Sequence, residues 1–528
     1  MRLLIVNPAV PPNLHCLTEA ADIAGVPAFM PNLALPTLAA LAPADVEVTL
    51  ADEAVAPVDL DTDCDVVAIT GYITQRGRMA QLAAEFRRRG RLVVIGGPYA
   101  SLSPQRMREH ADVLFIGEAE ETWPRFLADY RSGTWQTEYR ATRTIALDES
   151  PAPAMHLLQR RDYSMGVVQT SRGCPFECEF CDVIVYLGRK QRHKSPERVV
   201  AELETLHRLG YRRVFLSDDN LTAHRARARA IMQAVANWQR TKPERVFLVT
   251  QLSIDVARDR DLLGLCADAG LQQVFIGIET SDVDALREVK KRQNVRANLV
   301  DDIQTFFRHG ISVQAGMITG FDHDRLDAFE RQFRFAQQSG LPTLTAGVLN
   351  APDGTALERR LRAEGRIDED AVCDVYLGTN IVPKQMSRAQ LIEGARWLLN
   401  ALYIPDAFLA RLKVMASHLP DVRSYQAGDL RGAMLLWQRV VAGFTTLGPE
   451  FVRIPREAAR LFRGKSMELL SVNLVFYKHI ISVLRAWGAW DPVSGRGPAP
   501  FSGATAGGFG GSIGGEPLAA AGGLGSRP

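Results

Sequence analysis

Three cysteines stand within eight residues of one another, at Cys174, Cys178 and Cys181. Their spacing, C-x3-C-x2-C, suits a short loop that wraps three thiolates around an iron–sulfur cluster, because thiolates are the ligands of such clusters. No fourth cysteine lies nearby, since the next one, Cys266, comes 85 residues later. Three thiolates would leave one iron of a [4Fe-4S] cluster open, and the amino and carboxylate groups of a substrate could chelate it.

A zinc site is the alternative interpretation of the same loop. A structural zinc site normally uses four protein ligands, and the nearest histidine, His193, has no paired spacing with the cysteines. The other cysteines are most simply small buried hydrophobic residues, namely Cys16, Cys64, Cys266 and Cys373.

The cysteine loop follows a short strand expected at Val167–Gln169, and strands alternate with helices after it. Ser195-Pro196 favours the start of a helix and Gly210 its end. Further strands are expected at Arg213–Leu216, Val246–Thr250, Gln273–Ile278, Ser312–Ile318 and Leu344–Leu349. This alternation predicts a partial (βα)6 barrel, in which chemistry takes place at the carboxyl ends of the strands.

The residues before the loop also alternate between strand and helix. Strands are expected at Leu3–Val6, Val46–Ala51, Val66–Thr70, Leu92–Ile95 and Val113–Ile116, and a helix at Met79–Arg89. Such a pattern predicts a parallel, doubly wound, Rossmann-like sheet that binds ligands at the carboxyl ends of its strands. Two of those ends carry glycine or acidic residues, at 96–98 and 117–121.

The pattern as a whole predicts an α/β protein with a helical end. We expect a Rossmann-like domain at 1–140, a connector at 141–165, the partial barrel at 166–384 and a helical domain at 385–490. Residues 491–528 are rich in Gly, Ala, Ser and Pro with almost no aliphatic pattern, which predicts a disordered tail.

Composition excludes several classes of function. The formal net charge of +2 over 528 residues gives no electrostatic footprint for nucleic acid. The N-terminus is too short in its apolar part for a signal peptide, and no window reaches the ~18 uninterrupted apolar residues of a spanning helix. We therefore expect a cytoplasmic protein, in which cysteines are thiols or ligands rather than disulfides.

Residues 165–360 resemble the radical S-adenosylmethionine (SAM) superfamily. The cysteine loop after a first barrel strand carries the resemblance, together with polar or glycine-rich segments at the ends of later strands. The resemblance implies that the reduced cluster donates an electron to SAM, which releases methionine and a 5′-deoxyadenosyl radical. It also implies a set of SAM contacts, at Phe180, Asp219, Asn220, Thr250, Ser253, Glu279, Gly316 and Gly320.

A doubly wound domain ahead of such a barrel is similar to the cobalamin-binding radical SAM group. No D-x-H-x-x-G motif follows any strand, so the resemblance implies cobalamin bound without a histidine on cobalt. The implied cobalamin contacts are Thr70, Gly71, Tyr72, Gly96, Gly97, Gly117 and Glu118. The alternative is a nucleotide-binding or purely structural domain, although no G-x-G-x-x-G motif opens its first helix.

Segments at 293–294, 320–322 and 402–405, followed by the helical domain, resemble the subgroup that includes hopanoid C-2 methylases. That subgroup implies a methyltransferase that methylates an unactivated carbon of a lipid or natural product through methylcobalamin and a 5′-deoxyadenosyl radical. It also implies an electron donor such as flavodoxin or ferredoxin. A radical SAM oxidoreductase or cyclase remains an alternative, as does a non-catalytic cobalamin or redox sensor.

A few other residues could serve function, although a structural role explains each more simply. Glu118, Glu120 and Glu121 open a helix, where carboxylates favourably meet the helix dipole. Tyr72, Tyr99 and Tyr186 could reach a reaction chamber, and His323 could touch a substrate. Residues 467–490 could lie on a membrane and admit a lipid, giving peripheral membrane contact, but core packing of a last helix is the simpler expectation.

Overall fold

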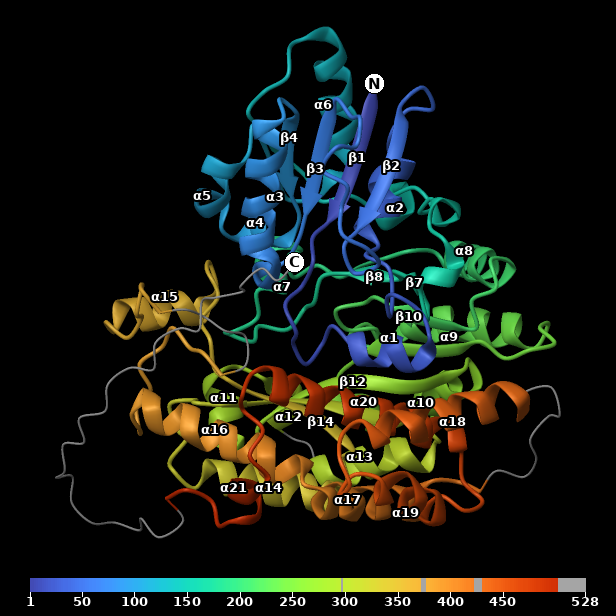
Figure 1. Ribbon diagram of the computed structural model, residues 1–528, viewed down its shortest axis with the longest axis vertical. Helices are drawn as coiled ribbons and strands as arrows, with labels where there is room; N and C mark the ends of the chain where they lie inside the picture. The colour runs from blue at the N-terminus through green and yellow to red at the C-terminus, as the bar shows by residue number, and fades with distance from the viewer. Residues whose placement is uncertain (296–297, 372–376, 422–429, 502–528) are drawn as a thin grey trace.

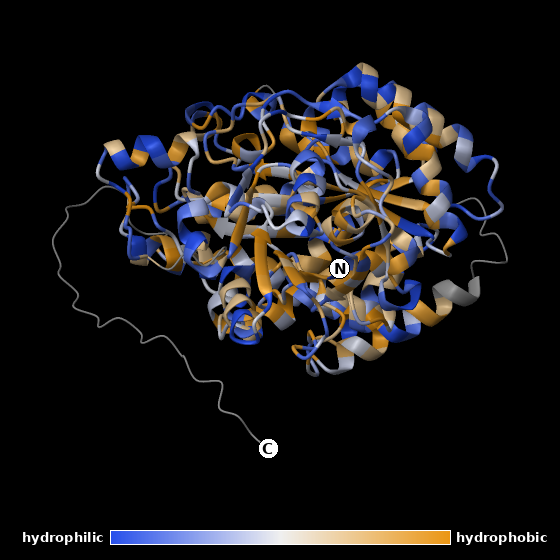
Figure 2. Ribbon diagram, turned by 90° about the horizontal axis from the view of Figure 1, so that it is seen from above, coloured by the Kyte–Doolittle hydropathy of each residue, from blue (hydrophilic) through white to orange (hydrophobic). Residues whose placement is uncertain are grey.

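The computed structural model describes residues 1–295, 298–371, 377–421 and 430–501 (Figure 1). Two parallel sheets dominate it, and helices from the C-terminal part pack beside the second sheet. Figure 2 shows largely hydrophobic strands in the interior, surrounded by helices that mix hydrophilic and hydrophobic residues. This is the α/β architecture with a helical C-terminal region that the sequence predicts.

The first sheet has six parallel strands in the order β2-β1-β3-β4-β5-β6. Their bounds are β1 Arg2–Asn7, β2 Glu47–Asp52, β3 Val66–Thr70, β4 Leu92–Gly96, β5 Val113–Ile116 and β6 Glu138–Arg140. One face packs on α2 (Ala34–Ala40) and α6 (Ala119–Ser132). The other face packs on α3 (Arg76–Arg88), α4 (Pro98–Leu102) and α5 (Pro104–Met107). Helices on both faces confirm the doubly wound domain; β6 is a strand that the hydrophobic pattern does not reveal.

The second sheet also has six parallel strands, in the order β14-β13-β12-β11-β10-β7. The strands are β7 Gly166–Val168, β10 Arg213–Leu216, β11 Phe247–Gln251, β12 Leu271–Glu279, β13 Ser312–Thr319 and β14 Thr343–Val348. The intervening helices are α8 Pro196–Arg208, α9 Arg225–Gln239, α10 Arg260–Asp268, α13 Leu299–Arg308 and α14 Ala328–Ser339. The order and the alternation confirm the partial barrel.

Short elements complete the barrel around the cysteine loop. A two-stranded hairpin pairs β8 (Ser171–Arg172) with β9 (Arg192–His193), and α7 (Val183–Tyr186) lies between them in the chain. The remaining short helices are α11 Val283–Glu288, α12 Arg292–Val295 and α15 Ala356–Ala363.

The C-terminal region is helical, as expected. Its helices are α16 Arg388–Tyr403, α17 Pro405–His418, α18 Leu430–Thr445, α19 Arg453–Leu461, α20 Met467–Ala486 and α21 Pro492–Arg496. Helix α21 corrects one expectation, because it falls inside the segment predicted to be a disordered tail. Asp491 begins it by donating its backbone N–H to Asn400 of α16 at 2.6 Å, and Asp491 also caps the helix. The rest of that segment, 502–528, lies outside the described residues.

Helix α20 decides between the two interpretations of residues 467–490. It is the one described helix long and apolar enough to cross a membrane, yet 72% of its apolar stretch is buried inside the protein. Tyr477 at its centre stacks on Phe444 of α18 and contacts Phe408 of α17. Its apolar residues therefore form a core face, which confirms the simpler expectation of core packing.

Several contacts attach the N-terminal domain to the rest of the protein, among them the pair between Arg106 and Asp353; two others involve α1 and the cysteine loop. Helix α1 (Thr18–Ala24) leaves its own domain and packs on α20, where Glu19 pairs with Lys478. Nearer the cysteine loop, Arg192 donates to Glu118 at 2.7 Å and Arg172 pairs with Glu118 at 3.0 Å. All three of these side chains are largely buried.

Replacing Glu118 by Gln should weaken the attachment near the cysteine loop. Removing the carboxylate leaves the buried guanidinium of Arg192 without its counter-charge, which we expect to lower the free energy of unfolding by about 3 kcal/mol. Urea unfolding near neutral pH measures the loss. The control is Glu138→Gln, whose partners Arg108 and Arg140 are exposed, and which should cost less than about 1 kcal/mol.

The pH dependence gives a second measurement on the same pair of variants. Burial opposes ionisation of Glu118, but the hydrogen bond from Arg192 and the charge of Arg172 hold its pKa below the ordinary value of 4.5. A lowered folded-state pKa adds stability above the ordinary pKa that is lost as the pH falls through the folded value. The gap between wild type and Glu118→Gln should therefore narrow in acid; a gap independent of pH would contradict the ion pair.

Candidate active site at the junction of the two domains

The cysteine loop is anchored by two consecutive aspartates that follow β10. Asp218 accepts hydrogen bonds from both the backbone and the hydroxyl groups of Thr170 and Ser171, just before the loop. Burial raises the pKa of Asp218 to about 6, although these hydrogen bonds offset part of the increase. Asp219 accepts from the backbone N–H of Gly173 at 2.8 Å, the residue before the first cysteine. The end of one strand thus fixes the start of the loop that follows its neighbour.

Gly173 itself is required by the close approach of another segment. It has a φ of +85°, and a Cβ there would stand 2.9 Å from the carbonyl oxygen of Gly188 and 3.0 Å from that of Lys190. Both contacts are to backbone, which cannot move aside as a side chain can. The loop can therefore fold back on residues 188–190 only with glycine at this position.

The three cysteines of the loop suit a cluster. Cys178 is buried, and Cys174 and Cys181 are half-buried, all as free thiols. Burial raises the pKa of both outer thiols, Cys181 to about 12, and the nearby Cys178 adds to the effect in each. Among the described residues no three His, Cys, Asp or Glu side chains lie close enough to hold a single metal ion. A cubane needs no such closeness, because each thiolate binds a different iron.

The remaining cysteines have separate places in the fold. Cys64 and Cys266 are buried in the cores of the two α/β domains, as expected. Cys16 is only half-buried. Cys373 lies outside the described residues.

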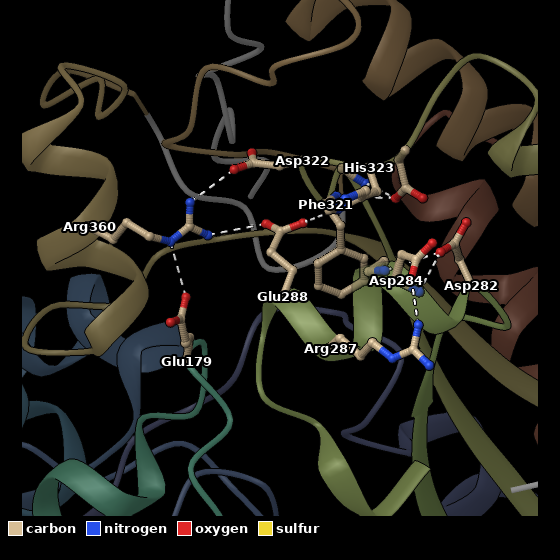
Figure 3. Close-up of polar contacts among 12 residues, drawn as sticks. Glu179, Asp282, Asp284, Arg287, Glu288, Phe321, Asp322, His323 and Arg360 are labelled. Carbon is tan, nitrogen blue, oxygen red and sulfur yellow. Dashed lines mark hydrogen bonds and ion pairs between the residues drawn. The ribbon is translucent and has the colours of Figure 1, made fainter. Parts of the chain in front are cut away.

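A charged network holds the cysteine loop from outside (Figure 3). Arg360 of α15 donates to Glu179 at 3.1 Å, to Glu288 at 3.3 Å and to Asp322 at 2.9 Å. Lys290 also pairs with Glu179, at 2.9 Å. Because Glu179 follows Cys178 directly, one guanidinium ties the loop to α11, to the loop after β13 and to α15.

His323 contacts the outer part of this charged network. Its Nδ1 lies 2.6 Å from Glu288, and more than half of its side chain is exposed. The hydrogen bond to Glu288 raises the pKa of His323. His323 therefore belongs to the surface end of the network and not to a substrate chamber.

The end of β12 holds a strained acidic residue. Glu279 is buried, and its φ of +65° is left-handed, a conformation that non-glycine residues rarely adopt. Its carboxylate accepts from Lys291 at 2.7 Å, and Lys291 also lies 5.8 Å from the centre of the Phe180 ring. A Cβ on Gly277 would stand 2.3 Å from the Glu279 carboxylate. The strand end thus turns one carboxylate inward beside the cysteine loop.

A cavity of about 510 Å³ lies where the two domains face each other. The carboxyl ends of β1, β3, β4 and β5 form one wall of it, and the mouth of the barrel forms the other. The barrel side includes Gln169, Arg172, Phe215, Ser217 and Asp219. One chamber is therefore shared by the glycine loops of the N-terminal domain and by a residue, Asp219, that positions the cysteine loop.

The N-terminal wall of the cavity suits a flat macrocycle with a long tail. Gly97 and Gly117 have φ values of +91° and +89°, and a Cβ on Gly97 would lie 2.4 Å from the Thr70 hydroxyl. Backbone therefore forms the wall where side chains would otherwise fill it. The cavity continues between the sheet and α2, along Ala68 and Leu38. The glycine loops and this slot are the part of the cavity expected to hold cobalamin.

Most of the expected cobalamin contacts line this cavity. They are Thr70, Tyr72, Gly96, Gly97, Gly117 and Glu118. Gly71 is not among the lining residues, and a Cβ there would face Met79 of α3 at 2.8 Å. Tyr72 and Tyr186 both line the cavity, and Tyr72 is 54% exposed. Burial raises the pKa of Tyr186, and the neighbouring Tyr72 and Asp182 add to the effect. Tyr99 is buried in the core beneath α4.

The expected SAM contacts are spread along the strand ends of the barrel. Asn220 donates to the Ser253 hydroxyl at 2.5 Å, which joins the ends of β10 and β11. Thr250 is fully buried and donates to the carbonyl of Leu216. A Cβ on Gly316 would face the Phe275 ring, and one on Gly320 would lie 2.8 Å from Leu391 of α16. Packing thus accounts for Thr250 and Gly320 without a ligand.

The structure also places residues at the cavity that the sequence pattern does not single out. His15 lies in the loop before α1, lines the cavity, and meets the Phe275 ring edge-on at 5.8 Å. His15 is exposed rather than enclosed by protein. Cys16 and Arg172 line the cavity as well. No sequence signal marks His15, because a lone histidine after prolines is typical of a surface loop.

Comparison with known proteins agrees with this geometry. Residues 168–336 match the radical SAM superfamily, residues 21–127 match the B12 binding domain, and residues 355–453 match a domain of unknown function, DUF4070. An uncharacterised methyltransferase of Synechocystis sp. is 35% identical over 78% of this chain and 78% of its own. The chain belongs to the cobalamin-binding radical SAM family. Its cofactors are the [4Fe-4S] cluster, SAM and cobalamin that the sequence resemblance implies.

Other relatives and solved structures extend the agreement. The hopanoid C-2 methylase of Rhodopseudomonas palustris is 28% identical over 86% of this chain and 88% of its own. The cobalamin-dependent radical enzyme OxsB, solved with aqua-cobalamin and SAM, has a TM-score of 0.61 at 15% identity, over 92% of this chain and 80% of that one. The methyltransferase TsrM of Kitasatospora setae gives a TM-score of 0.53 at 16% identity, over 74% and 82%. These two structures show the same fold.

Gly97→Ala should close the cobalamin wall of the cavity. Its Cβ would collide with the Thr70 hydroxyl and would lie 3.1 Å from the backbone nitrogen of Gly71. We expect affinity for hydroxocobalamin to fall ~10-fold or more, a loss of ~1.4 kcal/mol, measured by absorbance titration of the apoprotein. Gly90→Ala is the control, since Gly90 also has a positive φ, +73°, but a Cβ there would meet no atom within 4 Å. Equal affinity in both variants would place cobalamin elsewhere.

Proposed function

We propose that this enzyme transfers a methyl group from SAM to a carbon atom of a largely apolar substrate, such as a lipid or an apolar natural product. The single observation that carries the proposal is the shared cavity, which reaches from the glycine loops of the B12-binding domain to Asp219 beside the cysteine loop. A methyl carrier and a radical source would thus face one substrate position. The methyltransferase names of the relatives support the same reaction class.

The residues of this chain have distinct parts in the proposal. Bound together, the cofactors supply a methyl group and a 5′-deoxyadenosyl radical that abstracts hydrogen from carbon. Cys174, Cys178 and Cys181 would hold the cluster. Glu279 and Asp219 would orient SAM at the strand ends, together with Phe180, Asn220, Ser253 and Gly316. Thr70, Tyr72, Gly96, Gly97 and Gly117 would hold cobalamin, with Glu118 held in place by Arg192.

The outer cavity walls support an apolar substrate. Phe29, Met30 and Val10 line it from the N-terminal domain, and Phe215 lines it from the barrel. His15 is an exposed polar group among them, and its imidazole would meet a hydroxyl or carbonyl group of the substrate. A polar contact of this kind, once covered by the substrate, selects for the group that satisfies it.

The reaction is tested by quantifying its products under anaerobic conditions in the presence of a one-electron donor. Flavodoxin or ferredoxin is the proposed natural donor. Methyl transfer to an unactivated carbon should yield S-adenosylhomocysteine and 5′-deoxyadenosine together with a product heavier by one methylene. 5′-Deoxyadenosine alone would indicate an oxidoreductase or cyclase. No 5′-deoxyadenosine with a complete cluster would indicate a sensor, and either result would overturn the proposal.

Cys178→Ser should abolish the radical half of the reaction. Loss of the buried thiolate removes one of three cluster ligands, so reconstituted protein should hold less iron and sulfide and form no 5′-deoxyadenosine. The matched control is Cys64→Ala, because Cys64 is a buried thiol in the core of the N-terminal domain. Iron analysis and absorbance spectra measure the cluster independently of turnover. Full cluster content in Cys178→Ser would exclude this residue as a ligand.

A further inference from the structure

Helix α18 presents an apolar face to solvent. Met434 is 60% exposed, Leu435 52% and Val441 37%, and Val441 comes two helical turns after Met434, so the three share one side of the helix. The other side carries Val440 and Phe444, which are fully buried. A helix with apolar residues on both its inner and outer faces is unusual at a protein surface, because its outer residues gain nothing from folding.

The region from within α18 to just after α19 is strongly basic. Residues 434–465 contain six Arg or Lys and two Glu, a formal charge of +4, whereas the whole chain carries only +2. Arg456, Arg460 and Arg463 follow one another at helical spacing along α19 and just beyond it, and all three are exposed. None of the three has an ion pair among the described residues, in contrast to Arg453 at the start of the same helix. Val452, just before α19, is 47% exposed.

Helix α18 is connected to the cavity lining through α1. Helix α18 packs on α1 and α20, and Arg439 of α18 donates to the backbone carbonyl of Ala24 at the end of α1. The start of α1 and the residues just after it line the cavity, at Thr18 and Ala28. In Figure 1, α18 and α19 lie at the lower right of the helical region, with α1 above α18.

We propose that the outer face of α18, with the basic face of α19, docks on an anionic lipid bilayer and so brings a membrane-resident substrate to the cavity. Exposed apolar side chains beside unpaired arginines have the composition that binds an interface between lipid headgroups and acyl chains. The surface favours anionic lipid over an acidic protein because the apolar residues form one convex helix face and not a pocket. The substrate part of this inference rests on the proposed function, whereas the docking does not.

Vesicle sedimentation with the full-length protein tests the docking without any turnover. We expect binding to vesicles of phosphatidylcholine with phosphatidylglycerol, and much weaker binding to phosphatidylcholine alone. Arg456→Gln/Arg460→Gln/Arg463→Gln should weaken binding to the anionic vesicles ~10-fold or more, since the attraction of basic residues to such a surface accumulates with their number. The matched control is Arg161→Gln/Arg227→Gln/Arg240→Gln, three exposed arginines outside the helical region.

The contribution of the apolar residues of α18 to vesicle binding is tested by Met434→Glu/Leu435→Glu, which should also reduce binding ~10-fold or more. Its matched control is Val493→Glu, at a residue 78% exposed on α21. Equal binding by test and control variants would overturn the proposal, as would no binding by the wild type. So would a wild-type dimer in solution that Met434→Glu/Leu435→Glu dissociates, because the face would then be a subunit interface. Methylation of a detergent-solubilised substrate by a protein that binds no vesicles would leave the proposed function standing and exclude only the docking.

Discussion

The position of one buried carboxylate controls the geometry of the whole site. Glu118 belongs to the loop that ends β5, yet its partners Arg172 and Arg192 come from the hairpin that flanks the cysteine loop. Taking these charges out of water is costly unless each finds its counterpart. The two domains must therefore meet in the one orientation that brings them together. That orientation closes the cavity between the glycine loops and the strand ends of the barrel.

Backbone constraints then shape the N-terminal wall of the cavity and the strand end beside the cysteine loop. On the N-terminal side, Gly97 and Gly117 have positive φ values, so the wall is made of main chain. At the end of β12, outside the cavity lining, the left-handed conformation of Glu279 is kept by its bond to Lys291 and by the absence of a side chain at Gly277. Strained conformations of this kind persist only where surrounding contacts over-determine them. Unusual backbone conformations thus occur both in the N-terminal wall of the cavity and at a strand end beside the cysteine loop.

Much of this site could be predicted from the sequence, because several of its features depend only on residues close together in the chain. The cysteine spacing, the strand that precedes it and the glycine pair at 96–97 all act within a few residues, and the structure has them where the pattern indicates. The partners of Glu118 could not be predicted, since they lie 54 and 74 residues away and depend on the domain packing. The surroundings of Gly71 could not be predicted for a similar reason. The helix that follows it folds back and places Met79 beside it, where a Cβ on Gly71 would meet Met79 at 2.8 Å and Gln75 at 3.0 Å.

The C-terminal helices also show that composition alone does not predict which residues folding leaves exposed. Composition singles out α20 as the helix for a membrane, yet its neighbours bury it, and Tyr477 packs among aromatic rings from three other helices. Helix α18 is less apolar in composition, but tertiary packing leaves Met434 and Leu435 without a covering element among the described residues. A helix contacts lipid through the residues that folding leaves outside, whatever its mean hydropathy. In this protein those residues belong to α18, which packs on α1, the element that joins the B12-binding domain to the helical region and borders the cavity.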